Sequence, residues 1–246
     1  MIKKVFLLKI RFSNYEIKDF KKLIKKKGLF LFPSGPGLAT LKSNKKYYQS
    51  LKNADINFFD SGFFVLLLKF LKNINVHKFS GYLFTKYFLE YLKYSKRNLK
   101  IISVNPNKKL SISINKFLLK NVLTKKQLTN YVAPLYNLNK IVDPTLLKII
   151  KKKKKPRFIL INIGGGIQEI LGLYLKKNLN YKPSIICIGA ALTYFTGDQA
   201  PISAKLDRFY LGWLIRILYN PKTFLARYIK AFKLFYIVWN NKITFK

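Results

Sequence analysis

Residues 158–169 read Phe158-Ile-Leu-Ile-Asn-Ile-Gly164-Gly165-Gly166-Ile-Gln168-Glu169, an apolar run that leads through three glycines into a helix-like segment. This order indicates a buried strand, a bare loop and the start of a helix. Glycine lacks a Cβ, so the loop can bring its backbone N–H groups against a ligand, and the helix N-terminus behind it favours negative charge. The stretch therefore predicts either a phosphate-binding loop or a tight turn without a ligand, since it is neither a Walker loop nor a GxGxxG motif.

Strands and helices alternate on both sides of this stretch. We expect strands at 4–10, 29–32, 56–59, 100–104, 157–163 and 184–188, and helices at 15–27, 38–53, 63–71, 82–94, 116–123, 144–151 and 168–177. Alternation of this kind predicts an α/β fold with a parallel sheet and flanking helices. In such a sheet ligands bind at the carboxyl ends of the strands, so Ser34, Asp60, Gly164 and Gly189 are expected to gather there.

The character of the sequence changes near residue 206. We expect residues 1–205 to form the α/β core and residues 206–246 to form a basic C-terminal helical appendage of the same unit. Residues 224–239 place Arg227, Lys230 and Lys233 among aromatic and aliphatic side chains. A helix that lies in an anionic membrane interface has this pattern, but a helix that packs on its own domain shows it about as often.

No apolar stretch approaches the roughly 18 residues that a membrane-spanning helix needs. The N-terminus lacks the apolar core and the small-residue cleavage site of a signal peptide, and the one cysteine, Cys187, lies in an apolar run. We therefore expect a cytoplasmic protein.

The net charge is +39, from 48 Lys and Arg against 9 Asp and Glu. This excess favours polyanionic surroundings, namely nucleic acid, an anionic membrane face or phosphorylated substrates, although compositional drift on solvated faces explains it equally well. The few acids and the one histidine, His77, leave a short list of groups for acid–base chemistry. The counts of Cys and His exclude a Cys/His metal cage, and we expect neither a metal ion nor a cofactor.

Five sequence elements, in order over most of the chain, carry a resemblance to a known family. They are Ala54-Asp55 with Asp60-Ser-Gly62, then Lys78-Phe-Ser-Gly81, Gly164-Gly-Gly-Ile-Gln168-Glu169, Gly189-Ala-Ala with Thr196-Gly197, and Leu211-Gly-Trp213-Leu-Ile-Arg216 with Pro221 and Arg227-Tyr228. Together they resemble the WecG/TagA/CpsF glycosyltransferases, glycosyltransferase family 26.

The resemblance implies a Rossmann-like core and an inverting sugar transfer in cell-surface polysaccharide biosynthesis. The donor would be a UDP-sugar carrying an N-acetylmannosamine-like sugar, and the acceptor would be a sugar linked to undecaprenyl diphosphate at the cytoplasmic membrane. Asp60 matches the family's proposed catalytic base, and a carboxylate can take the proton of an attacking hydroxyl. N–H dipoles and cations would stabilise the leaving nucleoside diphosphate without a metal.

The residues expected to bind substrate follow from the same elements and from the turns at the strand ends. They are Ser34, Gly35, Gly62, Lys78, Gly164, Gly165, Gly166, Gln168, Glu169, Gly189 and Arg216. Gln168 would bond a sugar or a phosphate. Glu169 would hold a ribose or sugar hydroxyl, unless it only caps the helix.

The sequence departs from the family pattern at several positions. Phe32-Pro33-Ser34 replaces Thr-Pro-Asn, Lys78 replaces an arginine, and Thr193 stands where many members carry aspartate. Lysine keeps the charge but loses the planar fork with which arginine binds phosphate. These changes indicate a divergent branch, whose donor sugar could differ from N-acetylmannosamine.

Two classes of protein without this activity stay open. One is a basic nucleic-acid-binding protein, although the basic residues spread over the whole chain and no RRM, KH or helix-turn-helix signature is present. The other is a non-catalytic protein of the membrane surface. We expect an anionic membrane surface as a partner and no nucleic acid, and a homo-oligomer is compatible with the sequence.

Overall fold

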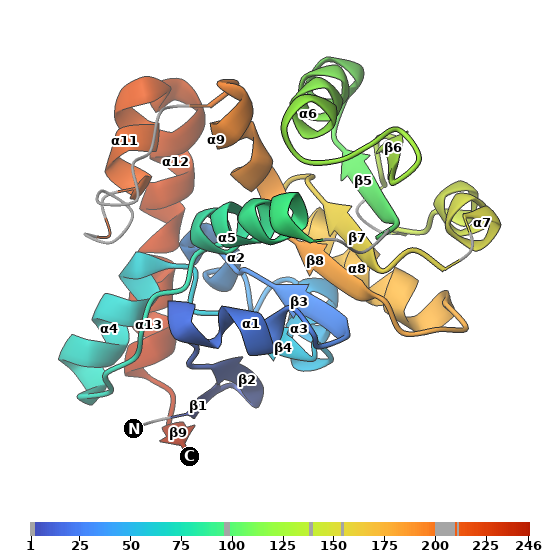
Figure 1. The fold of residues 1–246 in the computed structure, drawn as a ribbon. Coiled ribbons are helices and arrows are strands. Elements are labelled where there is room, and N and C mark those ends of the chain that lie inside the picture. Colours follow the sequence, from blue (N-terminus) through green and yellow to red (C-terminus); the bar gives the residue numbers. More distant parts are fainter. Residues whose placement is uncertain (1–2, 96–98, 138–139, 154, 200–209, 211) are drawn as a thin grey trace.

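Six parallel strands form the central sheet of the molecule (Figure 1). The computed structural model describes residues 3–95, 99–137, 140–153, 155–199, 210 and 212–246. Across the sheet the strands are β4 (Ile56–Asn57), β3 (Gly28–Leu31), β8 (Ser184–Cys187), β7 (Phe158–Ile161), β5 (Ile101–Asn105) and β6 (Leu128–Val132). Every neighbouring pair is parallel, so the predicted Rossmann-like α/β fold is confirmed.

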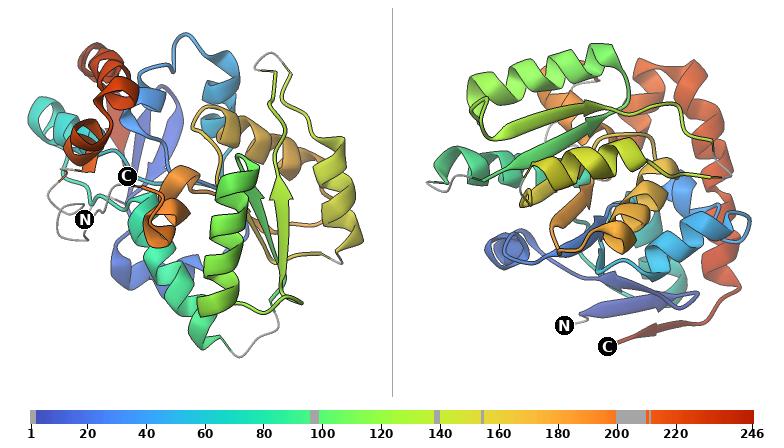
Figure 2. Two further views of the ribbon diagram at one scale, coloured as in Figure 1. Left: turned by 90° about the horizontal axis from the view of Figure 1, so that it is seen from above. Right: turned by 90° about the vertical axis from the view of Figure 1, so that its right-hand side faces the viewer.

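Helices cover both faces of this sheet (Figure 2). Successive side chains of a strand point to opposite faces, so Ile159 and Ile161 join one buried cluster while Phe158 and Leu160 join the other. The first face is covered by α3 (Lys45–Lys52), α7 (Pro144–Lys152) and α8 (Ile167–Asn178). The second is covered by α1 (Phe20–Leu23), α5 (Gly81–Tyr94) and α6 (Lys108–Asn121).

A small antiparallel sheet joins the two ends of the chain (Figure 1). Its central strand β1 (Lys4–Leu7) pairs with β2 (Ile10–Ser13) on one side and with β9 (Ile243–Phe245) on the other. The predicted C-terminal helices precede β9 as α11 (Gly212–Tyr219), α12 (Pro221–Ala231) and α13 (Lys233–Trp239). Leu234, Ile237 and Val238 of α13 are buried in the same cluster as the first face of the sheet. The C-terminal segment is therefore anchored to the core at both α13 and β9.

The remaining elements of the described part of the chain are η1 (Ile17–Asp19), α2 (Gly35–Leu38), α4 (Gly62–Lys72), η2 (Gly189–Leu192) and α9 (Thr193–Thr196). No helix within the described ranges is long and apolar enough to cross a membrane. The expected boundary at residue 205/206 falls outside the described residues and stays a prediction.

Several expected elements differ from the structure. Residues 4–10 are not one strand of the parallel sheet but part of the β1–β2 hairpin, where Leu8 and Lys9 turn the chain with φ values of 50° and 61°. The helix expected at 38–53 is interrupted because Asn44 starts a new helix, accepting a hydrogen bond from Tyr47 N–H at 2.9 Å. The helix expected at 15–27 consists only of η1 and α1.

Two further differences concern polar segments. The helix expected at 116–123 begins earlier, at Lys108, because Asn107 caps it through Leu110 N–H at 2.9 Å. Strand β6 was not expected, since at the sheet edge it is mostly half-exposed and carries little apolar pattern.

Replacing Gly28 by alanine should destabilise the fold by about 2 to 4 kcal/mol. Gly28 has φ +120°, and a Cβ there would lie 2.3 Å from Asp55 Oδ2. That carboxylate cannot easily move, because it accepts from Leu29 N–H at 2.8 Å and pairs with Lys176 at 2.6 Å. Urea unfolding measures the change. Gly164→Ala is the control, since a Cβ at Gly164 meets nothing within 4 Å, and equal unfolding midpoints for the two variants would contradict this account.

Candidate active site

Four turns meet at the carboxyl edge of the sheet. The chain leaves β3 through Ser34, β4 through Asp60, β7 through the triglycine loop (residues 164–166) and β8 through Gly189. A Cβ at Gly35 would lie 2.9 Å from Ser61 Oγ, and one at Gly165 would lie 4.0 Å from Ser34 Oγ. The structure therefore brings together the turns that the sequence placed at this edge.

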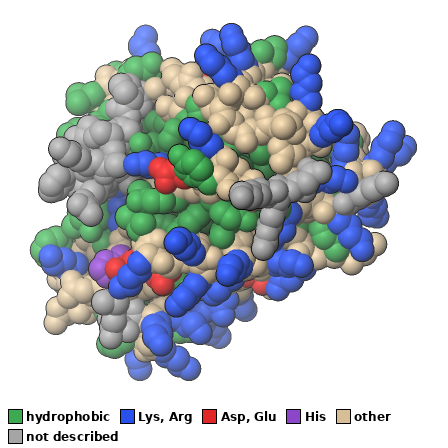
Figure 3. Space-filling model, in the orientation of Figure 1, with side chains coloured by type: hydrophobic (Ala, Val, Ile, Leu, Met, Phe, Trp, Pro, Cys, Tyr) green, Lys and Arg blue, Asp and Glu red, His purple; other side chains and the backbone are tan. Residues whose placement is uncertain are grey.

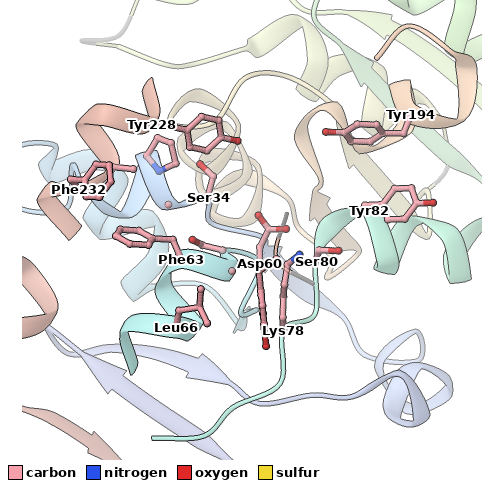
Figure 4. Close-up of a pocket in the computed structure, with 16 residues that line it drawn as sticks. Ser34, Asp60, Phe63, Leu66, Lys78, Ser80, Tyr82, Tyr194, Tyr228 and Phe232 are labelled. Carbon is pink, nitrogen blue, oxygen red and sulfur yellow. The ribbon is translucent and has the colours of Figure 1, made fainter. Parts of the chain in front are cut away.

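A cavity of about 250 Å³ opens at this edge (Figure 4). Its centre is polar, with Ser34, Asp60, Lys78 and Ser80. One side is an apolar wall, formed by Phe63 and Leu66 of α4, by Tyr228 and Ala231 of α12, and by Phe232, the N-cap residue of α13. The opposite side carries Tyr82 and Tyr194. On the face shown in Figure 3, hydrophobic side chains gather around the middle, and most Lys and Arg side chains surround them.

Asp60 lies in the middle of this cavity and is fixed by the backbone (Figure 4). Its Oδ1 accepts a hydrogen bond from Gly81 N–H, the first residue of α5, at 2.7 Å. The neighbouring Ser61 caps α4 by accepting from Phe64 N–H at 3.2 Å. The carboxylate is thus half-buried, held by the backbone at the start of α5, and directed to the space between the two walls.

Lys78 and Gly62 shape the cavity next to Asp60. Lys78 Nζ lies 5.7 Å from the centroid of the Tyr210 ring. A Cβ at Gly62 would lie 2.7 Å from Tyr210 Cδ1, so glycine is needed for this close packing. These contacts place one cation near the aspartate in a small, largely apolar space.

The triglycine loop lies beside Ser34 but outside the cavity lining that the structure describes. Gly166 has φ +91°, a conformation that glycine adopts readily. Gly164 and Gly165 are exposed. The loop therefore exposes the backbone of Gly164 and Gly165 in front of α8.

Gln168 and Glu169 are both buried and linked to the two glycine turns. Glu169 accepts from Gly166 N–H at 2.6 Å and from the Gln168 side-chain amide at 3.1 Å. Gln168 in turn accepts from Gly189 N–H at 2.8 Å. This chain of hydrogen bonds fastens the triglycine loop to the turn after β8.

Burial first, and then the nearby Asp60 charge, raise the pKa of Glu169 to about 7, against the hydrogen bonds that favour the carboxylate. Tyr47 lies in the same region, and sequence reasoning missed it. Its hydroxyl is buried and has no hydrogen-bond partner among the described residues. Burial, and then the charges of Glu169 and Asp60, raise the Tyr47 pKa. A buried polar cluster thus lies close to the cavity.

Sequence reasoning also missed the residues that make the two walls of the cavity. Phe63 directly follows the Asp60-Ser-Gly62 motif and could have been found from it. Tyr82, Tyr194 and Phe232 reach the cavity only through tertiary packing, for which the sequence gives no signal. The backbone of Arg216 lies in α11, but its side chain, like residues 207 and 208, is outside what the structure describes.

Within the described ranges, no group of three His, Cys, Asp or Glu side chains could hold a metal ion.

Glu169→Gln should change how stability depends on pH. Because the folded state raises the Glu169 pKa from 4.5 to about 7, it binds the proton more tightly than the unfolded chain, and wild-type stability falls as pH rises through this window. Glutamine cannot ionise but still offers an oxygen to Gly166 N–H. The variant should therefore gain up to about 3 kcal/mol relative to wild type on going from acid to alkaline pH.

Urea unfolding at about pH 5 and about pH 8 measures this difference. Glu90→Gln, at an exposed site on α5, is the control. If Glu169→Gln changes the free energy of unfolding by the same amount at both pH values, Glu169 does not titrate in this window.

Comparison with known proteins identifies the family to which the chain belongs. The model of the Glycosyl transferase WecG/TagA/CpsF family matches residues 5–246, essentially the whole length. No curated protein matches the sequence significantly. The matched range contains the Asp60 turn, the triglycine loop and the C-terminal helices, and the resemblance drawn from the five sequence elements is confirmed. The chain belongs to the WecG/TagA/CpsF family of glycosyltransferases.

Proposed function

We propose that this protein is an inverting glycosyltransferase of cell-surface polysaccharide biosynthesis. It moves an N-acetylmannosamine-like sugar from a UDP-sugar to a sugar acceptor linked to undecaprenyl diphosphate. The observation that carries the proposal is the position of Asp60, held by Gly81 N–H, at the polar centre of a cavity with an apolar wall. Membership of a glycosyltransferase family supports the reaction class.

Asp60 acts as the general base in this proposal. Its carboxylate takes the proton of an acceptor hydroxyl as that oxygen attacks the anomeric carbon of the donor. The bond between the anomeric carbon and the diphosphate oxygen breaks, and UDP leaves with the bonding electrons. A single displacement from the opposite side inverts the configuration. The hydrogen bond from Gly81 N–H at 2.7 Å keeps the carboxylate in place.

The leaving diphosphate needs positive charge or N–H dipoles beside it. The triglycine loop and the N-terminus of α8 offer such dipoles, and Lys78 offers a cation. Gln168 and Glu169 support this site by holding the loop, since their side chains are buried and bonded to Gly166 and Gly189. Direct contact of either side chain with substrate would require these bonds to open.

The acceptor end of the cavity suits a lipid. Phe63 of α4 and Phe232, between α12 and α13, meet with ring centroids 5.6 Å apart and offer an apolar surface for the first prenyl units. The outer surfaces of α12 and α13 expose Leu225, Ile229 and Tyr236 beside Lys230 and Lys233. Such a surface favours a peripheral position on the anionic inner face of the cell membrane.

Asp60→Asn should lower kcat by about a hundredfold or more, because the amide cannot accept the proton. The KM for the donor should change little, since the base contacts the acceptor. UDP release from a panel of UDP-sugars with a polyprenyl-diphosphate-linked sugar measures the reaction. Glu90→Gln removes an equal charge from an exposed site and is the matched control. Equal turnover of Asp60→Asn and wild type would refute the base assignment.

The same panel separates an enzyme from the alternative classes. If wild type turns over no UDP-sugar but binds oligonucleotides with a site preference, the glycosyltransferase proposal fails.

Replacing Leu225, Ile229 and Tyr236 together by serine should weaken binding to anionic vesicles by about tenfold or more, because the apolar contact with the membrane interface is lost. These side chains are exposed, so the substitution leaves the buried part of α13 intact. Co-sedimentation with vesicles containing phosphatidylglycerol measures the effect. The control replaces Tyr94, Ile112 and Leu135 by serine, because these side chains are exposed outside α12 and α13. An equal loss of vesicle binding in both triple variants, or no loss in either of them, would refute this membrane surface.

A further inference from the structure

Two tyrosines form the side of the cavity opposite the apolar wall (Figure 4). Tyr82 is the second residue of α5, and Tyr194 is the second residue of α9. Their ring centroids are 5.7 Å apart and the ring planes are nearly perpendicular, at 88°. We call this pair the aromatic corner. The proposed proton transfer, the leaving-group site and the membrane contact do not use it.

The aromatic corner is held rigidly from behind. Phe195 stacks on Tyr82 with the centroids 5.3 Å apart and the planes 9° apart. The ring centroid of Phe117, on α6, lies 6.4 Å from that of Phe195, so Phe117 packs against Phe195 in turn. Both tyrosines are half-buried and still line the cavity. A flat side chain fixed in this way offers contact area at a low cost in conformational entropy.

The corner is also adjacent to Asp60. Tyr82 follows Gly81, whose N–H holds the Asp60 carboxylate at 2.7 Å. In Figure 4, Asp60 lies between the apolar wall and the corner, and Tyr194 extends toward the centre of the cavity. A substrate hydroxyl that reaches Asp60 from this side therefore belongs to a group that lies against the two tyrosine rings.

Each chemical part of the two substrates matches a different part of the site. A prenyl chain suits the apolar wall, and a diphosphate suits Lys78 and the triglycine loop. A pyranose ring has polarised C–H bonds on its faces and hydroxyls around its rim, so it suits an aromatic face, with its negative quadrupole, beside polar groups. The polar groups next to the corner are Asp60 and Ser80.

We propose that Tyr82 and Tyr194 form a binding subsite for a hexopyranose ring of one of the two substrates. This inference rests on the proposed glycosyl transfer and assigns the sugar ring to a particular side of the cavity. The ring is that of the donor or that of the acceptor, and binding measurements separate the two.

The test compares Tyr82→Ala and Tyr194→Ala with Tyr82→Phe and Tyr194→Phe, which keep the ring. Tyr94→Ala is the control, because Tyr94 lies at the other end of α5 and is 77% exposed. Calorimetry measures the Kd of UDP and of UDP-N-acetylmannosamine. UDP release with a polyprenyl-diphosphate-linked N-acetylglucosamine gives the acceptor KM. Thermal unfolding shows whether each variant is folded.

We expect each alanine variant to bind the sugar about tenfold more weakly, and the phenylalanine variants and Tyr94→Ala to stay within about twofold of wild type. A weaker Kd for UDP-N-acetylmannosamine with an unchanged Kd for UDP assigns the donor ring. A raised acceptor KM alone assigns the acceptor ring. Unchanged constants in both alanine variants, or an equal loss for UDP itself, would overturn the subsite.

A second measurement keeps this inference separate from the proposed function. Saturation-transfer NMR with methyl N-acetyl-β-D-glucosaminide reports contact between a sugar ring and the protein without turnover. If the wild-type protein turns over no donor but contacts the sugar, and Tyr82→Ala and Tyr194→Ala lose this contact, the transfer reaction is wrong and the subsite stands. If the transfer reaction proceeds and neither alanine variant alters contact or KM, the subsite is wrong and the function stands.

Discussion

The pairing of β3 with both of its neighbours sets the geometry of the whole site. Leu31, the last residue of β3, is level with Asn57 of β4 on one side and with Cys187 of β8 on the other. Cys187 is in turn level with Ile161 of β7. Four strands therefore end at nearly the same height, and the turns that follow them are forced together. A register shift of one residue would move the buried side chains to the wrong face and separate these turns.

Several of the nine acidic residues have structural roles. Asp55 fixes the start of β3 through Leu29 N–H and pairs with Lys176 and Lys182. Asp143 caps α7 and accepts hydrogen bonds from the hydroxyls of Tyr131 and Tyr136. Glu169 is buried and bonded to the triglycine loop. Asp60 differs from these because it lines a cavity, where the proposed base could reach a substrate hydroxyl.

The sequence predicted the parts of the molecule that depend on local pattern. The apolar runs of β3, β7 and β8 and the small residues that end them are visible without a structure, and so are the triglycine loop and the Asp60 turn. The antiparallel sheet escaped prediction because β9 pairs with β1 from the opposite end of the chain. The aromatic corner escaped for the same reason, since α5 and α9 are distant in sequence. The burial of Glu169 depends on how α8 packs, which the expectation of a sugar contact did not include.

The C-terminal helices connect the cavity to the outer surface. One side of α12 supplies Tyr228 and Ala231 to the apolar wall, and Phe232 follows directly after it, while Leu225 and Ile229 of the same helix are exposed. At its far end the segment is fixed by the buried residues of α13 and by the pairing of β9 with β1. If the exposed residues lie in the membrane interface, as proposed, α12 sets a constant distance between that interface and Asp60. A lipid-linked acceptor could then keep its chain in the membrane while its sugar reaches the base, because one helix borders both environments.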